Sequence, residues 1–258
     1  MAKTNIYLFA NWKMYLDLAE SEKLAKELAK FSKKLPKKIK MAVFPTALST
    51  IVVVKNLKNS VVGVGAQNVY FEDKGGFTGE VSALMHKYAG AKYALVGHSE
   101  RRHLFHETNH EVKMKMEAVL NAGLMPVLCV GETAKEREDR KTEETIEIQL
   151  RSALHELNLN KTKKLIIAYE PVWAISKGTG VNDAGKHCDS AEAERLHQFI
   201  KNTVRQLLKG IEPIVLFGGS VRPNTAKEYL QKPNIDGVLV GAASTHLDSW
   251  KDIVHNAR

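Results

Sequence analysis

The chain has 258 residues, of which 44% are hydrophobic and 26% are charged, the composition of a globular protein with enough apolar material for a large core. It contains no apolar run of the roughly 20 residues that cross a bilayer, and we recognise no targeting pattern, so we expect a cytoplasmic protein with no membrane contact. The formal net charge of +9 favours an anionic partner, whether nucleic acid, acidic lipid or a phosphorylated metabolite.

The distribution of charge and of cysteine narrows these classes. A group of lysines lies between residues 26 and 40, around the end of one predicted helix. The one aromatic residue among them, Phe31, belongs to the apolar face of that helix, so these lysines lack the interleaved aromatic side chains that a surface stacking bases would require, and we expect a solvated face and no nucleic-acid partner. Cys129 and Cys188 suggest neither a disulfide framework nor a zinc site.

Strand and helix patterns alternate along the chain. Short apolar runs predict strands at residues 6–10, 41–44, 61–64, 93–96, 126–130, 165–168, 214–217 and 237–240. The segments between them repeat apolar residues at helical spacing, and no linker or low-complexity segment interrupts the alternation. About eight strand-helix units predict an α/β fold with one domain over residues 1–258, a closed (β/α)8 barrel with its active site at the C-terminal ends of the strands.

Candidate site residues follow the first and fourth predicted strands. Lys13, two residues after Asn11, could bind an anion, form a Schiff base with a carbonyl, or simply extend to solvent. His98 precedes Ser99, which we expect to cap a short helix, and a helix N-terminus disfavours a charged imidazole. A neutral His98 would donate a hydrogen bond to a ligand; a structural histidine, with Glu100 in a simple ion-pair cluster, is the alternative.

A carboxylate follows the sixth predicted strand. Glu170 comes after the apolar run 165–168, and Pro171 stops that strand from continuing. The small residues at 176 and 178–180 predict a hinged lid beside a catalytic base. The alternative interpretation is a solvated acid at a strand end, followed by glycines that only turn the chain.

Glycines and other small residues follow the seventh and eighth predicted strands, at 218–220 and 241–244. Backbone N–H groups in such loops are exposed to an anion, and barrels favour these two loops for phosphate. Together with the earlier residues they fit a phosphorylated carbonyl compound. Glu170 would remove a proton next to the carbonyl, His98 would donate a hydrogen bond and Lys13 would balance negative charge.

The motifs over nearly the whole chain resemble one known family. They are Asn-Trp-Lys-Met at 11–14, Ala-Gln-Asn at 66–68, Phe-Thr-Gly-Glu at 77–80, Val-Gly-His-Ser-Glu-Arg-Arg at 96–102, Cys-Val-Gly-Glu at 129–132, Ala-Tyr-Glu-Pro-Val-Trp-Ala-Ile at 168–175, Gly-Gly-Ser-Val at 218–221 and Asp-Gly-Val-Leu-Val-Gly at 236–241. In this order they resemble the triosephosphate isomerase family. The resemblance implies a TIM barrel with eight parallel strands and outer helices, acting in glycolysis and gluconeogenesis on triose phosphates, without cofactor or metal.

The resemblance also implies a role for each matched residue. Glu170 matches the family's base, His98 its neutral electrophile, Lys13 and Asn11 its substrate-binding pair, and Glu100 the acid that supports the histidine. The phosphate cradle corresponds to Ser220, Gly241, Ala242 and, if the lid is aligned on its Gly-Thr-Gly tip, Gly178. The segment 67–80 resembles a protruding loop that places Thr78 near the active site of a second subunit, so a homodimer is expected.

Three positions depart from the family pattern. The lid is longer, because Ser176 and Lys177 precede the Gly-Thr-Gly tip and the passage 181–189 is extended, so its register stays open. Phe217 stands where the family usually has a tyrosine that hydrogen-bonds the closed lid. This change removes a bond worth about 1 kcal/mol unless another latch replaces it. Ala242 replaces the second glycine of the phosphate cradle, which is harmless if that backbone needs no positive φ.

Two other functions stay possible on the residues alone. A Schiff-base aldolase would use Lys13 as its nucleophile, and borohydride would trap a substrate on that side chain. A non-catalytic sugar-phosphate-binding barrel with an altered lid would keep the anion site without the chemistry.

Overall fold

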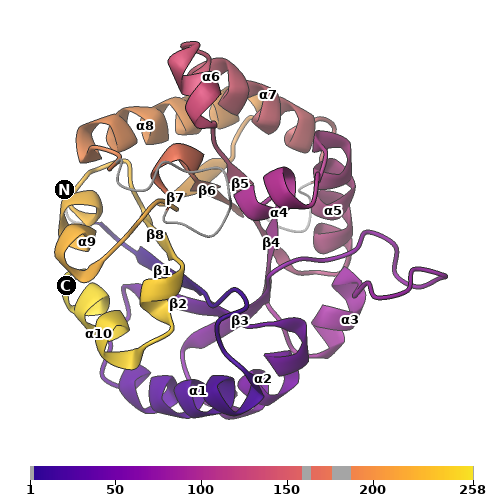
Figure 1. Ribbon diagram of the computed structural model, residues 1–258, viewed down its shortest axis with the longest axis vertical. Helices are drawn as coiled ribbons and strands as arrows, with labels where there is room; N and C mark the ends of the chain where they lie inside the picture. Colours follow the sequence, from indigo (N-terminus) through magenta and orange to yellow (C-terminus); the bar gives the residue numbers. More distant parts are fainter. Residues whose placement is uncertain (1–2, 159–163, 176–186, 258) are drawn as a thin grey trace.

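The computed structural model of the chain describes residues 3–158, 164–175 and 187–257. In these ranges eight parallel strands pair in chain order, and β8 pairs with β1 to close a barrel (Figure 1). The strands are β1 (Ile6–Asn11), β2 (Ile39–Phe44), β3 (Val62–Ala66), β4 (Tyr93–Val96), β5 (Met125–Val130), β6 (Lys164–Tyr169), β7 (Glu212–Phe217) and β8 (Gly237–Val240). This closed barrel confirms the predicted fold class, and each predicted strand overlaps an observed one.

Helices surround the barrel as an outer ring (Figure 1). They are α1 (Leu18–Ser32), α2 (Thr50–Leu57), α3 (Ala83–Tyr88), α4 (Ser99–Leu104), α5 (Asn109–Asn121), α6 (Ala134–Glu138), α7 (Thr142–Leu154), α8 (Ser190–Leu207), α9 (Pro223–Leu230) and α10 (Leu247–His255), with short 3-10 turns at η1 (Ala47–Ser49), η2 (Val172–Ala174) and η3 (Ala242–Ser244). Capping residues fix several starts: Asp17 and Glu20 form a capping box at α1, and Asp189 caps α8.

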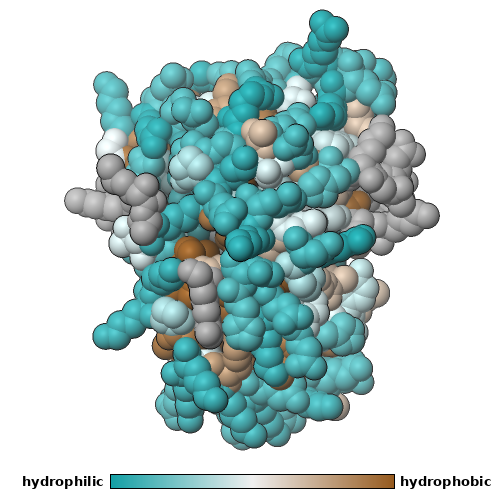
Figure 2. Space-filling view, turned by 90° about the vertical axis from the view of Figure 1, so that its left-hand side faces the viewer, coloured by the Kyte–Doolittle hydropathy of each residue, from teal (hydrophilic) through white to brown (hydrophobic). Residues whose placement is uncertain are grey.

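Apolar side chains form two layers. Strand residues that point inward, such as Phe9, Phe44 and Leu216, fill the barrel interior, while those that point outward pack against the helices. On the side that carries α8, α9 and α10 the outer surface is mainly hydrophilic (Figure 2), as expected for helices with one buried face. Within the described ranges no helix has both the length and the apolar character to cross a membrane.

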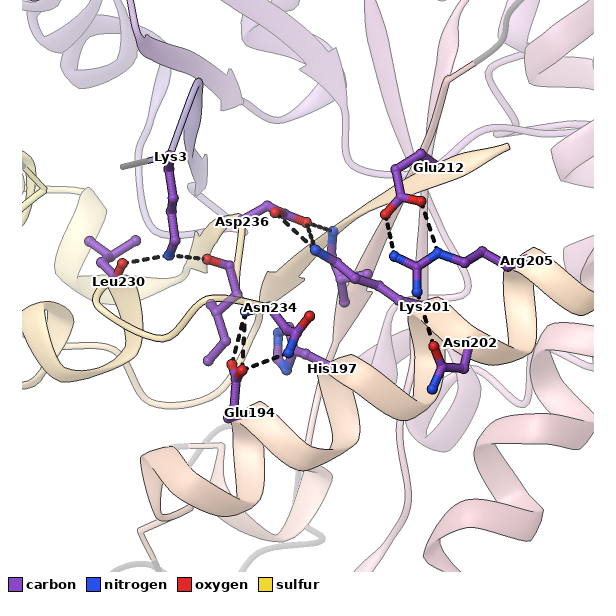
Figure 3. A network of polar contacts seen from close by, with 12 residues as sticks. Lys3, Glu194, His197, Lys201, Asn202, Arg205, Glu212, Leu230, Asn234 and Asp236 are labelled. Atoms are coloured by element: carbon purple, nitrogen blue, oxygen red, sulfur yellow. Dashed lines mark hydrogen bonds and ion pairs between the residues drawn. The ribbon is translucent and has the colours of Figure 1, made fainter. Parts of the chain in front are cut away.

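An ionic network secures the N-terminal end of the barrel, opposite the strand ends where we expected the site (Figure 3). The Lys201 ammonium on α8 lies 2.9 Å from Asp236 Oδ2, and the same oxygen accepts a 2.8 Å hydrogen bond from the Val215 N–H. Lys3 donates to the carbonyls of Leu230 and Ile235, and burial lowers the pKa of Lys3 to about 8. These contacts join β7, β8, α8 and the start of the chain.

A buried histidine on α8 should make the stability of the folded protein fall in acid. His197 lies against the rings of Tyr169 and Phe217, with Nδ1 2.6 Å from the Ala193 carbonyl oxygen. Burial lowers the pKa of His197 from 6.5 to about 3. As the pH falls from 6.5 towards 3, the unfolded chain takes up a proton that the folded chain refuses, so stability falls over that window.

We therefore expect this group to remove about 3 kcal/mol from the free energy of unfolding between neutral pH and about pH 4. Urea titrations of the wild type and of a His197→Phe variant at the two pH values measure the difference. The variant keeps an aromatic ring but cannot be protonated, so its stability should depend less on pH. Equal pH dependence in the two proteins would contradict the expectation.

Candidate active site

A cavity of about 240 Å³ opens at the C-terminal end of the barrel, as the sequence predicted. Its wall comes from the ends of β1, β4, β6, β7 and β8. The cavity is lined by Asn11, Lys13, Tyr15, His98, Glu170, Ile175, Gly218, Gly219, Ser220, Val221, Arg222, Leu239, Gly241, Ala242 and Ala243. The predicted site residues from the ends of these five strands therefore meet in one cavity. Glu100 is the exception, because it lies just behind Lys13. Tyr15 and Arg222 are additions that the sequence analysis missed.

Glu170 lines this cavity, and its side chain is almost fully buried. Its Oε2 accepts a 2.8 Å hydrogen bond from the Ser99 N–H, and its Oε1 lies 3.2 Å from His98 Nε2. Gly218 makes room for the carboxylate, because a Cβ at that position would lie 2.8 Å from Glu170 Cγ. With 2% of its surface exposed, Glu170 is not the solvated acid of the alternative interpretation.

His98 caps α4, which corrects the expectation that Ser99 would do so. The Glu100 N–H donates to His98 Nδ1 at 3.2 Å, and Ser99 is the first residue of the helix. An accepting Nδ1 must carry a lone pair, so this arrangement suits a neutral imidazole with its hydrogen on Nε2. That Nε2–H points towards Glu170. The cap moved by one residue because an imidazole nitrogen serves as a cap acceptor in place of a hydroxyl.

Lys13 is held in an uncommon backbone conformation beside the cavity. Its φ of 47° is left-handed, and three contacts hold it there. The Lys13 N–H donates to Asn11 Oδ1 at 3.1 Å, Gln67 Nε2 donates to the Lys13 carbonyl at 2.7 Å, and the ammonium lies 2.6 Å from Glu100 Oε1. Gln67 belongs to the Ala-Gln-Asn motif, but the sequence analysis gave it no role.

Two glycine-containing loops, after β7 and β8, form a further part of the cavity wall, and Gly241 lies next to the Lys13 side chain. Ser220 donates from its hydroxyl to the Ala174 carbonyl at 2.8 Å, which leaves the hydroxyl oxygen available as an acceptor and the loop backbone facing the cavity. Gly241 and Ala242 lead into the 3-10 turn η3. The Ala242 backbone is right-handed there, so the methyl group that replaces a glycine brings no strain. N–H groups at the start of such a turn lack partners within it and suit an anion.

A buried carboxylate supports the chain where the segment after β6 leaves the barrel. Glu132 accepts from Trp173 Nε1 at 2.6 Å and from the Tyr169 hydroxyl at 3.2 Å. Burial raises the pKa of Glu132, and these hydrogen bonds oppose that rise. The guanidinium group of Arg137 covers the Trp173 ring, with Cζ 3.9 Å from the ring centroid. The predicted lid residue Gly178 lies outside the described residues, as do all of 176–186.

The segment 67–80 projects from the barrel between β3 and α3, beyond the ring of helices (Figure 1). Tyr70 braces it from within, since its ring stacks on Phe71 and lies tilted against Phe77, and its N–H donates to the Val81 carbonyl at 2.9 Å. Thr78 is exposed on this loop and does not line the cavity of its own chain.

A second cavity, of about 510 Å³, adjoins the first behind Lys13. It is lined by Asn11, Lys13, Met14, Tyr15, Gln67, Asn68, His98, Glu100, Arg101, Leu104 and Phe105. Met14 is 91% exposed and Phe105 is 65% exposed, so this groove presents apolar surface next to charged groups of the first cavity.

Comparison with known proteins places this arrangement in a family. The sequence model of triosephosphate isomerase matches residues 6–257. The triosephosphate isomerase of Protochlamydia amoebophila is 39% identical over 97% of this chain and 93% of its own length. Those of Dictyoglomus thermophilum and Aquifex aeolicus are 41% and 40% identical, covering 95% and 96% of this chain and 96% and 97% of their own. With relatives this similar over nearly their full length, the chain belongs to the triosephosphate isomerase family.

Proposed function

We propose that the protein interconverts dihydroxyacetone phosphate and D-glyceraldehyde 3-phosphate by moving a proton between two neighbouring carbon atoms. The observation that carries the proposal is the pairing of Glu170 with His98 at 3.2 Å, inside a cavity that also holds the Lys13 ammonium and an anion-binding wall. Membership of the family supports the same reaction. The reaction would serve glycolysis and gluconeogenesis, and we propose a cytoplasmic location.

The geometry supplies a role for each group in the proton transfer. Glu170 removes a proton from the carbon next to the carbonyl, and the electron pair moves onto the carbonyl oxygen to give an enediolate. His98 Nε2–H and the Lys13 ammonium stabilise the negative oxygen, with Asn11 and Glu100 holding Lys13 in place. The proton of the neighbouring hydroxyl group moves to the former carbonyl oxygen, with His98 Nε2 giving one proton and taking up the other, and Glu170 returns its proton to the adjacent carbon, so the reaction needs no other reactant.

Substrate binding must rearrange the resting site. Glu170 is engaged by the Ser99 N–H and by His98, so its carboxylate has to leave these donors to reach a carbon atom. The same movement frees His98 Nε2–H for the carbonyl oxygen. Catalytic hydrogen bonds of this kind commonly form only once substrate is present.

The phosphate group is proposed to lie against the N–H groups of residues 219–220 and 241–242, since the Gly218 N–H already donates to the Tyr169 carbonyl at 2.7 Å. Both loops line the cavity, the second beside the Lys13 side chain and next to the end of β1, and their small residues let backbone donors approach the oxygens. Burying a phosphate dianion here also agrees with the net charge of +9.

A coupled assay that follows triose phosphate interconversion tests the proposed function. The isomerase is expected to turn over both substrates, whereas a non-catalytic sugar-phosphate-binding barrel would bind them unchanged. The 2.6 Å pairing of Lys13 with Glu100 suits a charged ammonium, which is no nucleophile, and so argues against the Schiff-base aldolase. Covalent trapping on Lys13 by borohydride, without isomerisation, would favour that aldolase instead.

We also propose that the protein is a homodimer in which the 67–80 loop of one copy enters the 510 Å³ groove of the other. The loop is internally braced and exposed, and the groove presents exposed Met14 and Phe105 to it. This insertion would bring Thr78 close to Lys13 and Glu100 of the second copy, so each active site would be completed by its partner.

A charged, bulky side chain at the loop tip is expected to separate the dimer. In sedimentation at micromolar concentration, Thr78→Arg should have the mass of a monomer, and its kcat/KM should fall on the order of 100-fold because Lys13 loses its outer support. Thr142→Arg, on the outer helix α7, is the matched control and should remain a fully active dimer. A monomeric Thr78→Arg protein with undiminished activity would show that the partner does not complete the site.

A further inference from the structure

A stack of aromatic rings lies beneath the proposed phosphate-binding loop. Phe217, the last residue of β7, is immediately followed by residues 218–220. Gly219 packs directly on the Phe217 ring, since a Cβ there would lie 2.5 Å from Phe217 Cζ. On its other side Phe217 stacks on Tyr229 of α9, with ring centroids 4.0 Å apart and planes inclined by 20°. The backbone of this loop therefore rests on the Phe217 ring, which in turn packs on the Tyr229 ring.

The Tyr229 hydroxyl ties this stack to the chain that enters α8. The hydroxyl donates to the Cys188 carbonyl at 2.6 Å, and His187 Nε2 lies 3.0 Å from the Tyr229 hydroxyl oxygen. Since the only hydroxyl hydrogen is used on Cys188, a His187 Nε2–H donates to the hydroxyl oxygen. His187 Nε2 is also 3.1 Å from Glu228 Oε1. Tyr229 itself is 1% exposed, so its polar end is satisfied inside the protein.

The same loop is tied on its other side to the chain that leaves β6. Ser220 Oγ donates to the Ala174 carbonyl at 2.8 Å. Ala174 follows Glu170 by four residues, and Cys188 precedes α8 by two. The segment from Phe217 to Tyr229 is therefore hydrogen-bonded to the connection between β6 and α8 at two residues. Ser220 binds Ala174 near the start of that connection, and Tyr229 binds Cys188 near its end.

We propose that Tyr229 is a positioning residue for the substrate phosphate. The ring supports Phe217 and, through it, the backbone donors of residues 219–220, and the hydroxyl anchors that support to Cys188. Phe217 has no hydroxyl with which to make such a bond itself. Tyr229 touches neither the reacting carbons nor the cavity, so it should affect binding of the phosphate and leave the proton transfer unchanged. The inference rests on the proposed isomerase function.

The test is a Tyr229→Phe variant, which keeps the ring stack and removes only the hydroxyl. Losing one hydrogen bond to the anchor is expected to raise KM for both triose phosphates about fivefold, with kcat within about twofold of wild type. The inhibition constant of inorganic phosphate should rise by a similar factor. Tyr7→Phe, in β1 and remote from the cavity, is the matched control and should leave all three values unchanged.

KM, kcat and the inhibition constant of phosphate together distinguish a positioning role of Tyr229 from a general structural effect. Unchanged KM and phosphate inhibition in Tyr229→Phe would overturn the proposal, as would a fall in kcat at constant KM, which marks a general structural effect. Calorimetric titration with inorganic phosphate measures the phosphate site without turnover. If the wild type binds phosphate but isomerises nothing, the proposed function fails, while weaker phosphate binding by Tyr229→Phe would still support the positioning role.

Discussion

Glutamine in place of Glu170 is expected to lower kcat/KM for the triose phosphates by at least 100-fold, and by up to about 10,000-fold, the range typical of general base catalysis. The amide keeps the size of the side chain and can still accept from the Ser99 N–H at the resting position. It cannot take a proton from carbon. The loss should therefore appear in kcat, with little change in KM.

The coupled assay on purified Glu170→Gln protein measures this loss. Circular dichroism and urea unfolding establish that the variant is folded. Glu147→Gln, on the outer helix α7 where Glu147 pairs with Arg151, is the control for removing a carboxylate and should behave as wild type. Activity of Glu170→Gln within tenfold of wild type would assign the base to another residue.

Methionine in place of Lys13 is expected to lower kcat/KM on the order of 100- to 1,000-fold. The ammonium lines the cavity and lies 2.6 Å from Glu100 Oε1 behind it. Without it the enediolate loses a stabilising charge and faces the unpaired carboxylate of Glu100. Both effects act on the negatively charged transition state and on the phosphorylated substrate, so KM should rise while kcat falls.

A double substitution separates these two effects. Lys13→Met together with Glu100→Gln removes the repulsion and leaves only the missing charge, so it should be more active than Lys13→Met alone. The left-handed backbone at Lys13 is held by Asn11 and Gln67, which both variants keep. Near wild-type activity of Lys13→Met would mean that His98 alone carries the electrostatic stabilisation.

The barrel could be predicted from the sequence because its strands are short, apolar and bounded by charged or small residues. A strand such as β6 is buried on both faces, so Leu165 to Ala168 read as an unbroken apolar run. Parallel strands of a barrel place all their C-terminal ends at one rim, and this rule brought Lys13, His98 and Glu170 together without knowledge of side-chain contacts.

The contacts behind those residues could not be predicted in the same way. His98 as the cap of α4, Gln67 as the support of Lys13, and Tyr229 as the anchor at Cys188 all depend on side-chain directions and on segments far apart in sequence. No periodic pattern marks them. Packing in the complete fold decides which groups become hydrogen-bond partners, and no local stretch of the sequence determines that packing.

Conversion of dihydroxyacetone phosphate in D₂O, followed by proton NMR, tests whether Glu170 carries the proton between the two carbon atoms, because a proton on its carboxyl group can exchange with solvent before it returns to carbon. The role of Glu170 as the base predicts isomerised product that carries deuterium, at least in part, at C2 of glyceraldehyde 3-phosphate, formed at least 100-fold more slowly by the Glu170→Gln protein at the same enzyme concentration. Isomerised product without any deuterium, or labelled product at an undiminished rate from Glu170→Gln, would contradict it.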